Sequence, residues 1–229
     1  MPPTTYAKIE TIYKEYSMRI RNFSVNVNGD YEFNPEKSIC VMKGKNAELH
    51  LRLLGMMIGC ADSVALVEQS DSPLFILHGD VEMGEKDYGV CFIYSKTEPH
   101  RVAVNFSRGG RGFSVEDTEQ YQKCLQLNGA DTENILSFPD GQNEGMAESE
   151  YALYLLDRFI TRSAEHTSRG DYRPLFIFGV FDRLDESVDV RPYLIRLSNL
   201  GRQVFLAVGD AYPVEKLSRP FVQTVETKQ

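Results

Sequence analysis

Short apolar runs alternate with longer amphipathic segments from residue 37 onward. The runs within 175–180 and 203–211 are apolar at nearly every position, as is typical of central strands covered on both faces. Apolar residues at helical spacing predict helices over 46–60 and 147–164, and a third helix is expected between Asp189 and Gly201. This alternation predicts an α/β fold: a three-layer α/β/α sandwich with a mostly parallel, Rossmann-like central sheet.

The first 36 residues follow a different pattern. A polar helix is expected over 5–16, and the alternating residues around Asn28-Gly29 predict two short antiparallel strands joined by a tight turn. We therefore interpret residues 1–36 as a helix-and-hairpin extension beside the main domain.

The main α/β domain is expected over 37–229, interrupted by an insertion at about 84–145. Within the insertion, the β-rich runs 88–95 and 101–107 predict an inserted β-hairpin, and another hairpin is expected over 63–79. The two inserted runs are joined by residues 96–100.

Composition excludes several classes of protein. The formal net charge of −8, from 25 basic and 33 acidic residues, makes nucleic-acid binding an unfavoured function. The four cysteines are widely spaced and form no Cys-x-x-Cys pair, which favours buried thiols in a reducing, cytoplasmic setting. No apolar run reaches the roughly 18 residues of a membrane span, and no nucleotide-binding or nucleophile motif is present, so no cofactor is predicted.

Acidic side chains follow the two predicted central strands. Asp182, Asp185 and Glu186 come after the first, and Asp210 comes after the second. Ligand-binding groups in open α/β sheets collect beyond the carboxyl ends of the strands. These acids therefore mark the edge of the sheet at which a site is expected.

The stretch from Arg173 to Leu217, "RPLFIFGVFDRLDESVDVRPYLIRLSNLGRQVFLAVGDAYPVEKL", resembles part of a von Willebrand factor A-type domain: its fourth strand, a short helix, a further strand and a closing helix. Residues 46–80 resemble the first helix and following hairpin of that family, especially its bacterial branch beside MoxR-type ATPases. The resemblance implies the same α/β fold, a role in protein interaction, and an AAA-type ATPase or another complex subunit as partner.

The family's chemistry is a metal-ion-dependent adhesion site, in which oxygen ligands hold a Mg²⁺-type cation. Of the residues that the resemblance would supply, only Asp182 is present; Lys43 and Lys45 stand where an Asp-x-Ser-x-Ser ligand set would begin. An ammonium group repels a divalent cation and can pair with a carboxylate directly. We therefore hypothesise that the metal site is degenerate and that a lysine replaces the metal.

A rival candidate lies at His78, Asp80 and Glu82, which share one face of a predicted strand and could support a metal-dependent hydrolase or nuclease-like activity, with Asp182 as a further member. The favoured interpretation is a non-catalytic interaction or adaptor domain, a subunit of a larger assembly, with no catalytic residues. Its predicted protein-binding residues are Asp182, Arg183, Asp185, Glu186 and Asp210.

Overall fold

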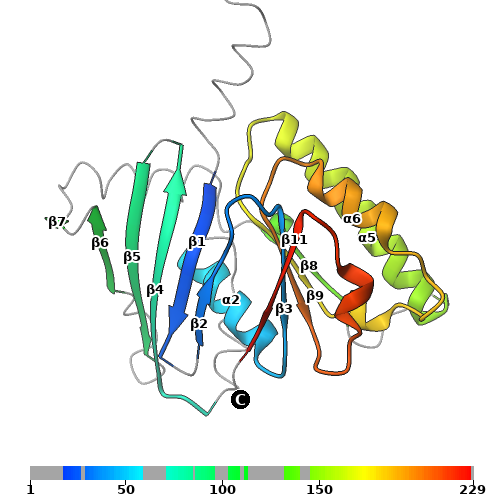
Figure 1. Cartoon of the computed structure of the whole chain (residues 1–229), viewed down its shortest axis with the longest axis horizontal. Coiled ribbons are helices and arrows are strands. Elements are labelled where there is room, and N and C mark those ends of the chain that lie inside the picture. The colour runs from blue at the N-terminus through cyan, green and yellow to red at the C-terminus, as the bar shows by residue number, and fades with distance from the viewer. Residues whose placement is uncertain are drawn as a thin grey trace, which may run out of the picture.

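The computed structural model describes residues 18–26, 29–58, 71–84, 86–95, 103–108, 111–112, 132–139 and 145–227. These residues form a first, antiparallel β-sheet and a second, parallel one, with helix α2 (Ala47–Met57) between them (Figure 1). Helices α5 (Glu148–Ser168) and α6 (Arg191–Ser198) cover the other face of the parallel sheet. The helix expected over 5–16 and the strand expected at 63–69 lie outside the described residues.

The second sheet is parallel and has the order β11-β3-β10-β9-β8. Its strands are β3 (Ile39–Lys43), β8 (Ile135–Ser137), β9 (Leu175–Phe178), β10 (Val204–Val208) and β11 (Val222–Glu226). Every residue of β9 and β10 is buried, as their continuous apolar runs predict. The α/β class and the parallel sheet are therefore confirmed.

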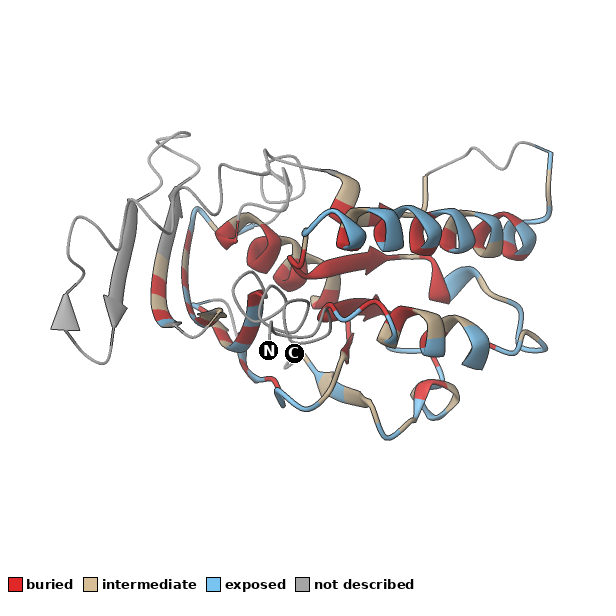
Figure 2. Ribbon diagram, turned by 90° about the horizontal axis from the view of Figure 1, so that it is seen from above, coloured by how far each residue is buried: buried red, intermediate tan, exposed pale blue. Residues whose placement is uncertain are grey.

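Alternate residues of the parallel sheet face two different cores. Met42 and Phe176 lie with α2 and the antiparallel sheet, whereas Val41 and Ile177 lie with α5 and α6. The predicted three-layer arrangement is thus incomplete, because the antiparallel sheet adds a layer beyond α2 (Figure 2).

The first sheet is antiparallel, with the order β2-β1-β4-β5-β6-β7. Its strands are β1 (Met18–Val25), β2 (Gly29–Glu32), β4 (Leu74–Met83), β5 (Lys86–Ser95), β6 (Ala103–Arg108) and β7 (Arg111–Gly112). The inserted hairpin is present as the β5–β6 pair, and the N-terminal hairpin as the β1–β2 pair. The long β4–β5 ladder, which joins the insertion to the preceding strand, was not predicted.

The N-terminal hairpin contributes directly to the main core. Phe23 and Phe33 are buried in the same cluster as Leu54 of α2 and Phe205 of β10. The Phe33 ring meets the Phe205 ring edge-on at 5.0 Å between centroids. The hydrophobic core therefore runs across the boundary that the sequence pattern places at residue 36.

Two glutamines of the parallel-sheet layer bind the backbone of the antiparallel sheet. Buried Gln203 accepts a hydrogen bond from the N–H of Ile20 at 2.7 Å and donates one to its carbonyl at 3.0 Å. Near the surface, Gln223 accepts from the N–H of Asn34 at 2.7 Å and donates to the carbonyl of Glu32 at 2.8 Å. Each side-chain amide makes the pair of hydrogen bonds that a neighbouring strand would otherwise make. The two sheets are therefore joined by polar contacts as well as by the core.

Candidate functional site

A pocket of about 170 Å³ lies at the carboxyl end of the parallel sheet. Small residues at the ends of neighbouring strands line it, and its charged groups come from the β3–α2 connection, the first turn of α2 and η2 (Phe181–Arg183). The lining residues are Gly44, Lys45, Ala47, Glu48, Gly179, Asp182, Ala207, Val208 and Gly209. The expectation of a site at this edge therefore corresponds to a real cavity that contains Asp182.

Asp182 is held by the backbone of the neighbouring strand end. Its Oδ1 accepts a hydrogen bond from the N–H of Gly209 at 2.9 Å. Partial desolvation raises the pKa of Asp182 above its ordinary value, and the negative charge of Glu48 acts in the same direction, against the opposing effect of the Gly209 hydrogen bond. Asp182 thus joins η2 to the end of β10.

The lysines do not pair with Asp182 as hypothesised. Lys45 lines the same pocket, but among the described residues no ion pair joins Asp182 to Lys45 or to Lys43. The sheet order gives the reason. β10 lies between β3 and β9, and the N–H of Gly209 at the end of β10 donates to Asp182.

The connection between β3 and α2 is too short for a phosphate-binding loop. Such loops place Gly-x-x-x-x-Gly-Lys-Ser/Thr between a strand and a helix, so that successive backbone N–H groups surround a phosphate. Here Gly44, Lys45 and Asn46 alone join the two elements, and an asparagine follows the lysine. Asn46 occupies the N-cap position of α2, as predicted, but its side chain makes no capping hydrogen bond.

The backbone around this connection is fixed from two sides. Gly44 donates its N–H to the carbonyl of Val208 at 3.1 Å, and Thr227 donates its N–H to the carbonyl of Lys43 at 2.8 Å. Gly44 has φ +131°, and a Cβ at this position would lie 2.0 Å from Oγ1 of Thr227. Only glycine satisfies both the conformation and the space.

We expect Gly44→Ala to lower the free energy of unfolding by about 2–3 kcal/mol, because it adds both a disfavoured φ and a steric clash. Gly145→Ala is the matched control, since Gly145 has φ +80° with nothing within 4 Å of an added Cβ and should cost only about 1 kcal/mol. Urea denaturation of both variants measures the difference. Equal losses would show that contact with Thr227 does not constrain the turn.

The other predicted binding residues lie around the pocket on the same edge of the sheet. Arg183, Asp185, Glu186 and Asp210 are all exposed. Arg183 pairs with Glu148 of α5 at 2.6 Å and lies 5.5 Å from the Phe138 ring centroid. The backbone of the loop is anchored, because Asp185 donates its N–H to Oγ of Ser149 at 2.9 Å and Glu186 accepts from Lys216 at 3.0 Å.

The rival set lies elsewhere. His78, Asp80 and Glu82 do share one face, as predicted, but that face belongs to the antiparallel sheet and points away from its buried residues Leu77 and Val81.

All three residues lie within β4, and the two carboxylates have structural partners. Asp80 accepts a hydrogen bond from Asn22 at 2.5 Å, and Glu82 pairs with Arg21 at 2.9 Å. Asp182 lies at the edge of the parallel sheet and is therefore not brought together with these three residues.

Within the part of the chain that the structure describes, no three His, Cys, Asp or Glu side chains form a group suited to a metal ion. No helix among these residues is long and apolar enough to cross a membrane.

Comparisons with known proteins identify a shared fold. No family model matches the chain, and no curated protein sequence matches it. A solved structure of an Smc head bound to the C-winged helix domain of ScpA matches with a TM-score of 0.54 and 7% identity, covering 86% of this chain and 91% of that one. The SMC head domain from Thermotoga maritima matches with a TM-score of 0.51 and 8% identity, covering 90% of this chain and 94% of that one. At these identities the similarity concerns the fold alone, and the resemblance to the von Willebrand factor A-type domain stays a prediction.

Sequence reasoning missed Glu48 as a member of the pocket. Glu48 lies in the first turn of α2, immediately after the connection that contains Lys45. It forms an ion pair with Arg52 at 2.7 Å, and the Arg52 guanidinium in turn lies 4.3 Å from the Phe178 ring centroid. The available signal was its place in the sequence: Glu48 is the second residue of a helix that follows a buried strand.

Proposed function

We propose that this chain is a non-catalytic protein-interaction subunit of a larger assembly. The observation that carries the proposal is the β3–α2 connection: three fixed residues beside a pocket of about 170 Å³, where a phosphate loop would require a longer glycine-rich turn. β9 is followed by Gly179 and Val180, so the first carboxylate after this strand is Asp182, which is bound to Gly209. The site has the location of a binding centre without the groups for phosphate chemistry.

The exposed residues around the pocket supply the interaction surface. We define the acidic edge as Asp182, Asp185, Glu186 and Asp210. None of these four has an ion pair within 4 Å among the described residues, whereas Arg183 is neutralised by Glu148. Unpaired surface carboxylates steer association and select partners by charge.

The solved Smc head provides a precedent for the same fold in a protein complex, since it is bound to a winged-helix domain of ScpA. By extension, the partner of this chain is a protein subunit, and an AAA-type ATPase is the candidate that the von Willebrand A-type resemblance favours. In this proposal the pocket binds no divalent metal, and Lys45 stands in place of the missing ligands.

Affinity purification of the full chain from its native host tests the proposal. Asp185→Arg with Glu186→Arg is expected to lose a stoichiometric protein partner that the wild-type chain retains. Asp30→Arg with Glu165→Arg is the matched control, because it makes the same change in net charge at exposed positions away from the edge. Loss of the partner from both variants would contradict a role of the acidic edge.

A second measurement addresses the metal. Mg²⁺ or Mn²⁺ is expected to leave the melting temperature of the wild-type chain unchanged. Lys45 lines the pocket together with Asp182, and the other carboxylate of the lining, Glu48, already forms an ion pair with Arg52. A thermal shift that Asp182→Ala abolishes would contradict the degenerate site. Divalent-dependent hydrolysis that Asp80→Asn abolishes would favour the enzyme instead.

A further inference from the structure

The edge strand β8 is attached to the parallel sheet differently from its neighbours. Among the described residues it pairs with β9 alone, through Ile135–Phe176, Leu136–Ile177 and Ser137–Phe178. Of its three residues only Leu136 is buried, with 8% of its surface exposed, whereas all four residues of β9 are at most 1% exposed. Apolar burial therefore holds β8 less fully than β9: Leu136 lies within the core beside α5, whereas Ile135 and Phe138 are only partly buried against the two cores.

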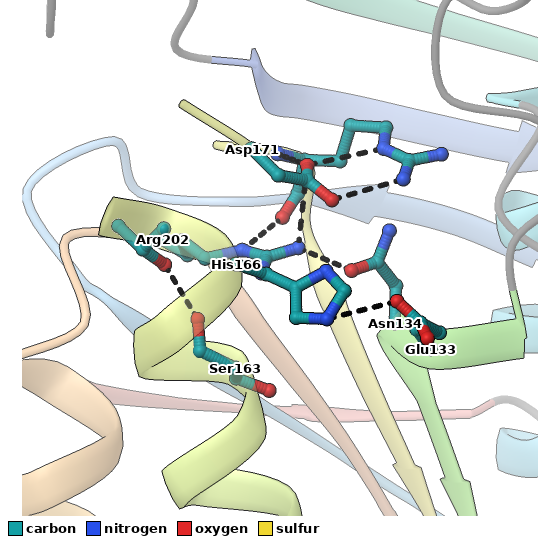
Figure 3. Close-up of polar contacts among 8 residues, drawn as sticks. Glu133, Asn134, Ser163, His166, Asp171 and Arg202 are labelled. Atoms are coloured by element: carbon teal, nitrogen blue, oxygen red, sulfur yellow. Dashed lines mark hydrogen bonds and ion pairs between the residues drawn. The ribbon is translucent and has the colours of Figure 1, made fainter. Parts of the chain in front are cut away.

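Polar contacts from three other elements hold the segment instead. Arg202, just before β10, donates to Oδ1 of Asn134 at 2.5 Å. His166 of α5 meets Glu133 at 2.9 Å, and Arg52 of α2 donates to Oγ of Ser137 at 3.0 Å. Figure 3 shows Glu133 and Asn134 on one side of this cluster, with His166, Asp171 and Arg202 on the other.

The side of the cluster opposite β8 has polar contacts of its own. Arg173 donates two hydrogen bonds to Asp171, at 3.1 and 2.9 Å, and Arg202 donates to the carbonyl of Arg173 at 2.6 Å. Burial alone would raise the pKa of Asp171, but the Arg173 hydrogen bond and the charge of Arg202 lower it below its ordinary value. The Arg202 guanidinium thus keeps a charged neighbour and a hydrogen-bond acceptor when Asn134 leaves.

We propose that residues 132–138 form a latch, an edge segment that opens and recloses while β9, β10 and β3 remain folded. Water can replace the polar partners of Glu133, Asn134 and Ser137 during opening, whereas it cannot replace apolar contacts in a core. Segments with few buried apolar contacts are those that open locally with a free energy below that of global unfolding. This inference goes beyond the proposed function and does not depend on it.

Opening of the latch would change the surface next to the acidic edge. Phe138 follows β8, and its ring lies 5.8 Å from that of Tyr151 and 5.5 Å from the Arg183 guanidinium. Release of the latch would separate these groups and expose the backbone edge of β9, to which an extended segment can add as a strand. The latch thereby sets whether that edge is covered.

Native-state hydrogen exchange of the full chain tests the latch. In the wild type, those amides of residues 135–138 that face β9, such as the Phe138 N–H bound to the carbonyl of Phe178 at 3.0 Å, are expected to exchange at a rate that low urea leaves unchanged. The amides of β10 should exchange faster as urea is added. If the two sets respond to urea in parallel, β8 opens only with the whole sheet and the proposal is overturned.

Asn134→Ala removes the acceptor of Arg202 and should accelerate exchange in residues 135–138 by roughly tenfold without affecting β10. Asn199→Ala, at an exposed site after α6, is the matched control and should change neither set. Glu133→Gln, which removes the charge that faces His166 at a partly exposed position, should accelerate the same amides to a smaller extent. Unchanged exchange in both latch variants, or equal acceleration in β8 and β10, would overturn the proposal.

Discussion

Replacing Gln203 with leucine is expected to lower the free energy of unfolding by about 2–4 kcal/mol. Gln203 is 5% exposed and forms hydrogen bonds with both the N–H and the carbonyl of Ile20. Leucine has a similar size but leaves both backbone groups buried without this partner, and each such group costs about 1–3 kcal/mol. Equilibrium urea denaturation, followed by far-ultraviolet circular dichroism, measures the loss.

Gln223→Leu is the matched control for this substitution. Gln223 forms the same pair of contacts, with Asn34 and Glu32, but these hydrogen bonds lie at the surface, where water can replace the lost amide. We expect a loss below about 1 kcal/mol. Similar losses for the two variants would mean that burial of the Ile20 backbone does not explain the effect.

The sequence was sufficient where a strand is buried on both faces. β9 and β10 are continuous apolar runs, and their ends lie within three residues of the predicted ones. β8 and β11 were missed, because they are short edge strands with only half-buried or exposed positions beside Leu136. Such patterns do not differ from those of polar loops.

Partners distant in the sequence account for most of the remaining differences. A glutamine before a strand reads as a strand boundary, yet Gln203 binds Ile20, which lies 183 positions away. In the same way, nothing local to Asp80 indicates that Asn22 will bind it in the middle of a sheet. The local periodicity correctly places Asp80 on a polar face, but only the pairing of β1 with β4 gives that face a structural role.

The candidate site was predicted in its location more than in its chemistry. The rule that sites lie beyond the carboxyl ends of parallel strands brought Asp182 and Asp210 to the correct edge. It could not show that Gly209 would bind Asp182, because this contact depends on the strand order β3-β10-β9. The space around Gly44 is likewise limited by Thr227, a residue 183 positions later in the sequence that also binds the carbonyl of Lys43.

Truncating Phe205 to alanine is expected to lower the free energy of unfolding by about 3–5 kcal/mol. Its ring is fully buried between Phe33, at 5.0 Å, and Phe176, at 5.3 Å between centroids. Alanine leaves a cavity that the surrounding strands and α2 cannot fill by small movements. Phe221→Ala, at a partly buried position beside the other core, should cost only about 1–2 kcal/mol.

The same core tests whether the N-terminal hairpin is an extension or an integral part of the fold. Because Phe33 packs against Phe205, Phe33→Ala should shift the one unfolding transition that Phe205→Ala shifts, and the two losses should be less than additive. Calorimetry of the single and double variants measures this coupling. Two separate transitions, of which Phe33→Ala moves only one, would instead support an independent extension over residues 1–36. A single shared transition would mean that the antiparallel sheet, α2 and the parallel sheet unfold together, so the pocket edge depends on residues at the start of the chain.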